Sequence, residues 1–394
     1  MSKIVQRNKE EWNRIQKMSE QRLEYYFKDD YTGESMPHTI NLSLNNYCFM
    51  KCRMCDIGQS RANRKDKDMF FNNRAAGGGK AYTLPLEIVK KLIDDVAPYK
   101  TIIRPNFVEP LLRADIDEIA GYVTSKGLDF YIITNGYLLS KKAKTLVEAG
   151  MRVLRVSIDG TKDRHNEIRG LPDSFQRSIK GIEIVIEEKK RLGLEYPLIG
   201  ICFTISDHNY DNLLDFYREL DSLGIAKEIY IAFNFLRYST MEEAQTQNAL
   251  FPQFFPLTQS SISCIDVEDI DTEELCRQIK AVRDEFAPDS YKYHFNPHLN
   301  DDEIKKWFDK KTYLHPEIPC FAPWTVAQVF YDGTVGVNGR CVSPSFGNII
   351  DKPFHEIWNS EQARDFRMKL RKTPIMPVCN RCCRTFKVDD EKKD

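Results

Sequence analysis

The stretch Cys48-Phe49-Met50-Lys51-Cys52-Arg53-Met54-Cys55 places three cysteines in a C-x3-C-x2-C spacing, directly after a strand-like run at 39–44. Three thiolates on one tight loop can hold three irons of a cubane cluster and leave the fourth iron open to a small molecule. A structural zinc site instead uses four ligands, usually in two C-x2-C-like pairs. The nearest further cysteine or histidine is His38, which lies upstream of the strand. The spacing therefore favours an iron–sulfur cluster with one open iron over zinc.

Composition limits the classes of protein to which this chain can belong. Its 394 residues are enough for two domains, or for one large α/β domain with an appendage. A formal net charge of −1 gives no electrostatic argument for nucleic acid or a membrane surface as a partner. No apolar run approaches the roughly 18 residues that span a bilayer, and the N-terminus has no apolar signal segment. Eleven cysteines without an export signal favour metal or redox chemistry in a reducing compartment, so we expect a cytoplasmic protein.

From residue 39 onward, strand-like runs alternate with amphipathic helix-like runs. The predicted strands cover 39–44, 101–108, 129–134, 152–158, 198–205 and 228–235. The predicted helices cover 85–96, 114–125, 141–149, 175–192 and 210–223. This order predicts right-handed βαβ units and a parallel α/β sheet. Elsewhere we expect helices at 4–28, 272–285 and 301–308, with 4–28 packed on the outside of the main domain and 238–270 irregular.

These features together resemble the radical S-adenosylmethionine (SAM) enzyme family. The resemblance implies a partial (β/α)6 TIM-like barrel whose chemistry lies at the C-terminal ends of the strands, where the cysteine loop follows the first strand. It implies that Cys48, Cys52 and Cys55 ligate a [4Fe–4S] cluster and that the open iron binds SAM. In the family, an electron from this cluster cleaves SAM to methionine and a 5′-deoxyadenosyl radical.

Two positions early in the barrel match SAM contacts of the family. Met54, just before the third cysteine, lies by resemblance against the adenine. The stretch Asn106-Phe107-Val108-Glu109-Pro110 stands where the family usually has Gly-Gly-Glu-Pro, so Glu109 is implied to receive the SAM ammonium. Phe107 and Val108 replace both glycines, which changes how closely the backbone can approach the ligand.

Later strands supply further candidates by the same resemblance. Ser157 in Val156-Ser157-Ile158-Asp159-Gly160 and Arg169 before Gly170 resemble the peptide- and sugar-modifying branch, where they bind the SAM carboxylate and ribose. The planar guanidinium of an arginine suits a carboxylate. Asn135, after the third strand, faces the same mouth, and Ile201 on the fifth strand helps to enclose the adenine. Cys202, its neighbour, is expected to be a buried core thiol.

A second cysteine set follows residue 319. The stretch 320–383 contains Cys320, Cys341, Cys379 and Cys382, with Cys383 adjacent, and a hairpin with an Asp332-Gly333 turn at 326–335. It resembles the small cysteine-rich α+β domain called SPASM, or its shorter form, twitch. The resemblance implies one auxiliary [4Fe–4S] cluster held by the first four cysteines, although Cys383 is an alternative to Cys382. The spacing alone also permits a zinc ribbon.

These predictions divide the chain as follows: an N-terminal helical extension at 1–38, the barrel at 39–237, a connecting and substrate-covering segment at 238–318, the auxiliary-cluster domain at 319–386 and a charged tail at 387–394. The predicted function is a radical SAM oxidoreductase with flavodoxin or ferredoxin as electron donor. Its expected substrate is small and polar, such as a carbohydrate or aminocyclitol. A maturase of a ribosomal peptide or protein is the alternative, and a non-catalytic zinc-binding interaction protein is the hypothesis from another class. The net reaction and the general base stay open at this point.

Overall fold

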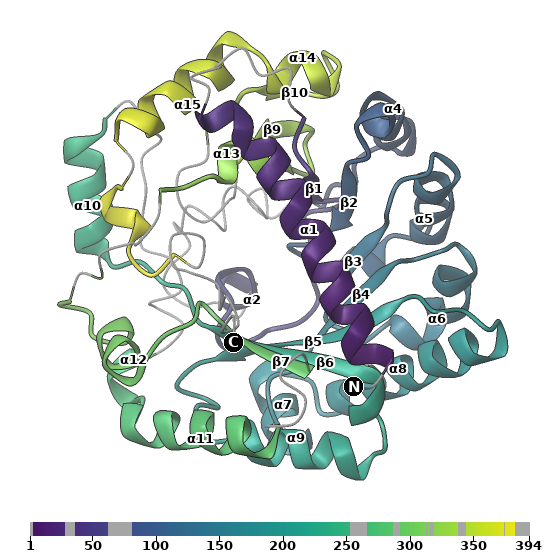
Figure 1. The fold of residues 1–394 in the computed structure, drawn as a ribbon, viewed down its shortest axis with the longest axis vertical. Coiled ribbons are helices and arrows are strands. Elements are labelled where there is room, and N and C mark those ends of the chain that lie inside the picture. The colour runs from purple at the N-terminus through teal and green to yellow at the C-terminus, as the bar shows by residue number, and fades with distance from the viewer. Residues whose placement is uncertain are drawn as a thin grey trace.

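The computed structural model describes residues 3–27, 36–61, 81–252, 266–286, 292–312, 314, 319–337, 344–373 and 375–382. Parallel strands form a partial TIM-like barrel with helices on the outside, as predicted (Figure 1). The strands of the predicted barrel are β1 Thr39–Leu42, β2 Ile102–Pro105, β3 Tyr131–Thr134, β4 Val153–Ser157, β5 Leu198–Ile205 and β6 Ile229–Phe235. An isolated bridge between Ile103 and Phe130 joins β2 to the start of β3, so the two five-stranded sheets continue into each other.

The barrel wall is longer than the sequence analysis predicted, because β7 (Tyr293–Asn296) pairs in parallel with β6. At the other edge, β8 (Val326–Val329) pairs in parallel with β1. The hairpin of β8 and β9 (Thr334–Gly336) confirms the predicted turn, and β10 (Gly347–Asn348) adds to it. The first strand of the cysteine-rich segment thus belongs to the barrel sheet.

The helices that follow the strands pack their apolar faces on the outside of the barrel. They are α4 Leu86–Val96, α5 Ile116–Ser125, α6 Leu139–Glu148, α7 Lys162–Arg169, α8 Ser174–Arg191 and α9 Leu213–Ser222. In α8, the buried side chains include Phe175, Ile182 and Val185, which recur at helical spacing. The short, charged helix α7 was not predicted, and it carries Arg169 as its last residue.

Helix α1 (Lys3–Phe27) crosses the barrel over the ends where the strands begin (Figure 1). Its Ile15 and Met18 pack on a separate apolar cluster made of the first residues of four strands: Ile102, Tyr131, Val153 and Leu198. The helix therefore packs against the main domain, as expected, and covers the N-terminal end of the barrel.

The segment after β6 is more regular than predicted. The helix α10 (Met241–Leu250) contradicts the irregular structure expected over 238–270, whereas α11 (Thr272–Glu285) and α12 (Asp301–Trp307) confirm two predicted helices. The helix α10 was missed because its polar sequence lacks an apolar stripe, although Thr240 and Glu243 form a capping box that could have revealed it.

The remaining elements are short or lie in the C-terminal segment. They are α2 Asp56–Arg61, α13 Ala322–Thr325, α14 Phe354–Trp358, α15 Glu361–Lys372, and the 3-10 turns Ala97–Tyr99, Pro110–Leu112, Ala226–Glu228, Val267–Asp269 and Pro377–Cys379. Among the helices that the structure describes, none combines the length and the apolar character needed to cross a bilayer.

Candidate functional site

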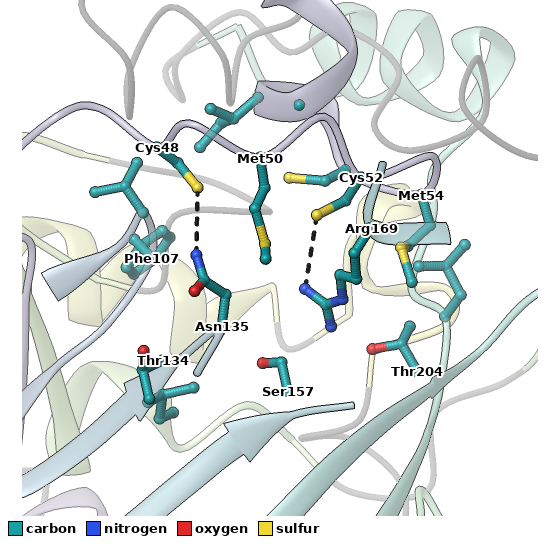
Figure 2. A pocket seen from close by; sticks show the side chains of 16 residues that line it. Cys48, Met50, Cys52, Met54, Phe107, Thr134, Asn135, Ser157, Arg169 and Thr204 are labelled. Atoms are coloured by element: carbon teal, nitrogen blue, oxygen red, sulfur yellow. Dashed lines mark hydrogen bonds between the residues drawn. The ribbon is translucent and has the colours of Figure 1, made fainter. Parts of the chain in front are cut away.

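A cavity of about 200 Å³ lies at the C-terminal ends of the strands, under the cysteine loop (Figure 2). Its walls come from the loop after β1, from the ends of β3, β4 and β5, and from α7. The lining residues are Cys48, Met50, Cys52, Met54, Cys55, Ile57, Gly58, Phe107, Val108, Ile133, Thr134, Asn135, Ser157, Arg169, Thr204 and Leu236. One cavity thus brings together the three cysteines, Met54, Asn135, Ser157 and Arg169, all of which the sequence had nominated.

The cysteine loop is held in a compact turn by close backbone contacts. A Cβ atom built on Gly58, in α2, would lie 2.7 Å from the backbone nitrogen of Cys52, so no larger residue fits there. The backbone N–H of Arg53 donates to the carbonyl of Ile168, at 2.9 Å. Because Ile168 belongs to α7, this contact fixes the loop next to the helix that carries Arg169.

Two cysteine sulfurs accept hydrogen bonds from side chains across the cavity (Figure 2). Asn135 Nδ2 lies 3.8 Å from Cys48 Sγ, and Arg169 Nη1 lies 3.7 Å from Cys52 Sγ. Burial and the nearby Glu109 raise the pKa of Cys48 to about 12. Burial also raises the pKa of Cys52 to about 11, although the charge of Arg169 opposes this. Both thiols are therefore neutral without a metal, and a bound metal must displace their protons.

Arg169 has a second partner, because its guanidinium forms an ion pair with the buried carboxylate of Asp159. Asp159 Oδ1 also accepts a hydrogen bond from the backbone N–H of Thr204, at 2.9 Å. Burial raises the pKa of Asp159, while the charge of Arg169 lowers it. The ion pair holds Arg169 with one nitrogen directed at the cysteine loop, beside Ser157 in the cavity wall.

Glu109 is fully buried, and it holds two residues of the cavity wall, Thr134 and Asn135, in place. Its carboxylate accepts hydrogen bonds from the backbone N–H of Leu111 at 2.9 Å, from the Thr134 hydroxyl at 2.6 Å and from the backbone N–H of Asn135 at 2.7 Å. Burial raises the pKa of Glu109 to about 7, against these three hydrogen bonds. In the same segment, Phe107 has a φ of 80°, the left-handed conformation that glycine adopts most easily.

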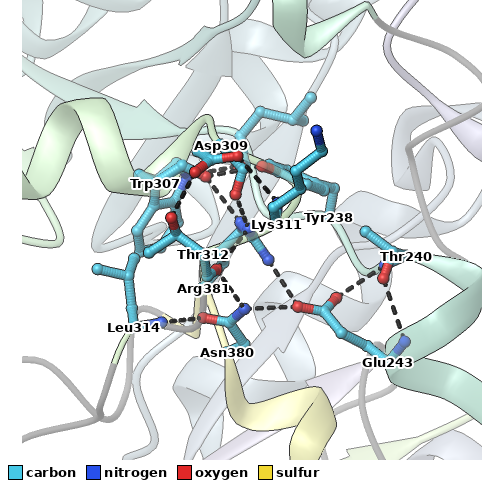
Figure 3. A network of polar contacts seen from close by, with 11 residues as sticks. Tyr238, Thr240, Glu243, Trp307, Asp309, Lys311, Thr312, Leu314, Asn380 and Arg381 are labelled. Atoms are coloured by element: carbon cyan, nitrogen blue, oxygen red, sulfur yellow. Dashed lines mark hydrogen bonds and ion pairs between the residues drawn. The ribbon is translucent and has the colours of Figure 1, made fainter. Parts of the chain in front are cut away.

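The turn that carries Cys379 and Cys382 is connected to the rest of the chain by polar contacts of Asn380 and Arg381, which lie between these two cysteines (Figure 3). The backbone N–H of Cys382 donates to the carbonyl of Cys379, at 3.2 Å, so these two residues share one turn. Between them, the buried Arg381 pairs with Glu243 of α10 at 2.6 Å and donates to the carbonyl of Trp307 at 2.7 Å. Cys320 is half-buried beside the core, and the predicted ligands Cys341 and Cys383 lie outside the described residues.

Comparison with known proteins identifies both parts of the chain. Residues 42–230 match the Radical SAM superfamily, and residues 320–383 match SPASM, an iron–sulfur cluster-binding domain. The chain belongs to the radical SAM family. This radical SAM enzyme has its SPASM domain at the C-terminus, in the stretch that the sequence analysis assigned to it.

Two curated relatives resemble most of this radical SAM enzyme. It is 26% identical to Fe-coproporphyrin III synthase of Methanosarcina barkeri, over 87% of this chain and 79% of that protein. It is 28% identical to AdoMet-dependent heme synthase of the same organism, over 73% of this chain and 76% of that protein. The solved structure of native anSMEcpe with bound AdoMet has a TM-score of 0.55 and 15% identity, over 84% of this chain and 83% of that one. At that identity the likeness concerns the fold alone.

The radical SAM domain implies a [4Fe–4S] cluster and SAM as cofactors, and the SPASM domain implies auxiliary iron–sulfur clusters. The donor set of the cavity fits the first of these, since three thiols line it and two of them receive hydrogen bonds from Asn135 and Arg169. Among the described residues, no three Cys, His, Asp or Glu side chains converge on the position of a single metal ion. A cubane cluster binds each thiolate through a different iron, so its ligands do not have to meet at one point.

The structure separates the nominated SAM contacts into two groups. Met54, Asn135, Ser157 and Arg169 line the cavity, whereas the described lining includes neither Glu109 nor Ile201, which are both buried behind it. The sequence analysis did not nominate Thr204 and Leu236. Thr204 could have been found, because it is a polar residue near the end of an apolar strand, at the level where the other candidates lie. Nothing in the sequence singles out Leu236. Cys202 is half-buried, which corrects its expected role as a buried core thiol, because it lies on the inward face with Thr204.

Proposed function

We propose that this protein is a radical SAM oxidoreductase that takes a hydrogen atom from a C–H bond of a small polar substrate held inside the barrel. One observation supports a polar substrate. Below the cavity, β2 and β4 carry Arg104 and Arg155 on the strand faces that alternate with core residues, and β6 carries Asn234 on such a face, level with the cavity residue Thr204. An interior built only to fill space would be apolar, as in most barrels of this kind.

The cysteines divide into two ligand sets under this proposal. Cys48, Cys52 and Cys55 would hold the SAM-binding [4Fe–4S] cluster, and Cys320, Cys341, Cys379 and Cys382 would hold one auxiliary [4Fe–4S] cluster. When bound, these groups supply a 5′-deoxyadenosyl radical that accepts the hydrogen atom and an acceptor for the remaining electron, with flavodoxin or ferredoxin as the external donor. The net result is a two-electron oxidation of the substrate.

The residues of the chain orient the ligands and exclude water. Asn135 and Arg169 donate hydrogen bonds to ligand sulfurs, which stabilises thiolates and tunes their electron density. Met54, Phe107 and Val108 give the cavity apolar walls that keep solvent away from reactive species. In the proposed SAM complex, Arg169 and Ser157 bind the carboxylate and ribose, and Met54 packs on the adenine. Glu109 would then reach the SAM ammonium only after giving up part of its present hydrogen bonding.

A carbohydrate or aminocyclitol remains the first substrate class of this proposal. A tetrapyrrole is the second, supported by the names of the two Methanosarcina relatives that align along most of the chain. Both classes fit an enzyme that oxidises an unactivated carbon.

The test is anaerobic reconstitution followed by metal analysis and SAM cleavage. Two [4Fe–4S] clusters require about eight irons per chain, and the reduced enzyme should release 5′-deoxyadenosine. Both iron content and cleavage should fall when Cys48, Cys52 or Cys55 is replaced by Ala. Transfer of deuterium from a labelled aminocyclitol, coproporphyrin or peptide into 5′-deoxyadenosine would identify the substrate class. About two zincs per chain with no SAM cleavage would overturn the proposal in favour of a zinc-binding interaction protein.

A further inference from the structure

A buried arginine of the SPASM domain is held by uncharged groups. Arg367 lies in the middle of α15, and only 2% of its surface is exposed. Its Nε donates to the carbonyl of Pro323 at 2.9 Å, and its Nη1 donates to the carbonyl of Trp358 at 2.9 Å. Its Nη2 is buried and has no hydrogen-bond partner. Among the residues that the structure describes, no carboxylate forms an ion pair with this guanidinium.

The surroundings of Arg367 do not neutralise its charge. The ring of Trp358 lies 4.5 Å from the guanidinium carbon, a contact that attracts a cation but carries no net charge. Burial, together with the positive charge of Arg364, lowers the pKa of Arg367 to about 9, so the side chain is still charged near neutral pH. A charge buried without a counter-charge is costly. We therefore expect an anionic group close to Arg367.

Two further hydrogen-bond donors in this region lack an acceptor. Trp324 and Trp358 are buried, and the indole N–H of each has no hydrogen-bond partner. Trp324 directly follows Pro323, and Trp358 supplies the second carbonyl that binds Arg367. A buried indole N–H normally has a partner. Three unused donors beside an uncompensated positive charge are the pattern expected next to an anionic acceptor.

The first predicted ligand of the auxiliary cluster lies close to this arginine in the chain. Cys320 stands three residues before Pro323, so their Cα atoms are at most about 11 Å apart. The segment between them is turned, since the backbone N–H of Trp324 donates to the carbonyl of Phe321 at 3.0 Å. A [4Fe–4S] cluster held by four thiolates carries a net negative charge, and its sulfurs accept hydrogen bonds. The auxiliary cluster therefore fits the anion that this region lacks.

We propose that Arg367 supplies a positive charge that stabilises the reduced auxiliary cluster and so raises its reduction potential. The charge acts through the protein interior, where water screens it little, so no direct contact with a sulfur is needed. This inference rests on the proposed function, because it takes Cys320 as a ligand of that cluster. A higher potential makes the cluster a better acceptor for the second electron of the proposed oxidation.

The test is a redox titration of the auxiliary cluster, followed by electron paramagnetic resonance, in protein that carries Cys48→Ala, Cys52→Ala and Cys55→Ala. These substitutions remove the signal of the other cluster. Arg367→Met should favour the oxidised form about tenfold, which for one electron is a shift of about 59 mV toward more negative potential. Arg367→Lys keeps the charge and should stay near the unsubstituted potential. Lys372→Met removes an exposed charge from the same helix and is the matched control, which should leave the potential unchanged because water screens that charge.

Arg367→Gln is a second charge-free variant. It keeps an amide donor for a neighbouring carbonyl, so it serves as the test if Arg367→Met does not fold. An unchanged potential in Arg367→Gln with the iron retained would overturn the inference. An equal shift in Arg367→Lys and Arg367→Gln would also overturn it, because the effect would then come from geometry and not from charge.

Iron content separates the remaining outcomes. Loss of the auxiliary iron from both charge-free variants, with the iron retained in Arg367→Lys, would support the inference, because the charge would then be needed to hold the cluster. Loss of this iron from all three variants would contradict it and assign Arg367 to packing. These outcomes differ from a failure of the proposed function, which would appear as zinc in the wild type or as a wild type that does not cleave SAM.

Discussion

The backbone N–H of Asn135 donates a hydrogen bond of 2.7 Å to the Glu109 carboxylate, which is fully buried. Through its side chain, Asn135 in turn contacts Cys48 Sγ. A residue outside the cavity wall therefore controls the position of a residue that touches a predicted cluster ligand. Gly136 makes the turn possible, since its φ is 80° and a Cβ atom there would lie 2.6 Å from Val156 and Ser178.

This relationship predicts the effect of Glu109→Gln. The substitution keeps the shape of the side chain but turns one acceptor oxygen into a donor, opposite groups that already donate. We expect the free energy of unfolding to fall by about 1–3 kcal/mol, and the iron content after reconstitution to fall with it. Glu118→Gln, on the exposed face of α5, should change unfolding by less than about 0.5 kcal/mol. Denaturant unfolding and iron analysis provide the comparison, and equal behaviour of the two variants would contradict a positioning role for Glu109.

The cluster loop provides a second prediction through Gly58. An added methyl group would meet the backbone of Cys52 at 2.7–2.9 Å, and backbone atoms cannot move aside as a side chain end can. Gly58→Ala should therefore cost about 1–3 kcal/mol of unfolding free energy and reduce iron binding. Gly121→Ala, in the interior of α5 with nothing within 4 Å, should instead stabilise by roughly 0.5–1 kcal/mol. Wild-type iron content in Gly58→Ala would show that the loop is less tightly held than the structure indicates.

Much of the barrel could be predicted because its strands appear in the sequence as apolar runs that alternate regularly with amphipathic helices. β7 could not be predicted, because two of its four residues, His294 and Asn296, are polar and its identity as a strand depends on pairing with β6. Phe107 could not be assigned a left-handed backbone, since its side chain argues against it and only the surrounding structure imposes it.

The candidate site shows the same division. Candidate site residues at strand ends could be predicted because a parallel barrel places the C-terminal ends of its strands at the same end of the fold. Most of these candidates line the cavity. Partners could not be predicted: Asp159 was part of a quoted motif, but its pairing with Arg169 depends on how α7 returns to the sheet. Arg104 and Arg155 did carry a signal, as single charged residues inside strands of otherwise uncharged residues.

The buried Glu11 of helix α1 makes the stability of the fold depend on pH. Burial alone would raise the pKa of Glu11, but hydrogen bonds from Arg152, Arg14 and Tyr131 outweigh it and lower the pKa to about 2, from 4.5 in an unfolded chain. The lowered value means that the folded state gains stability above pH 4.5 and loses it as the pH falls from about 4.5 toward 2. At 1.36 kcal/mol per pKa unit, the contribution near neutral pH is about 3 kcal/mol.

Glu11→Gln should therefore lower the free energy of unfolding by about 3 kcal/mol at pH 7 and flatten its decline in acid. Glu10→Gln, on the exposed face of the same helix, is the control and should leave both nearly unchanged. Urea unfolding between pH 3 and 7, a range chosen to cover most of the titration, measures the difference. Parallel pH profiles for wild type and Glu11→Gln would show that α1 does not derive its stability from this carboxylate.

The final prediction concerns the turn between Cys379 and Cys382. Arg381 adopts a φ of 56° and is fully enclosed, with Glu243 as its carboxylate partner at 2.6 Å. Glu243→Gln leaves a buried guanidinium without its counter-charge, which costs about 3–5 kcal/mol in similar pairs. If Cys379 and Cys382 hold an auxiliary cluster, iron should fall from about eight to about four per chain, while SAM cleavage by the other cluster persists. Glu242→Gln, the exposed neighbour on α10, should retain all the iron. Loss of SAM cleavage in Glu243→Gln with the auxiliary iron retained would contradict this prediction. It would mean that the contact between Arg381 and α10 supports the radical SAM cavity and not the auxiliary cluster.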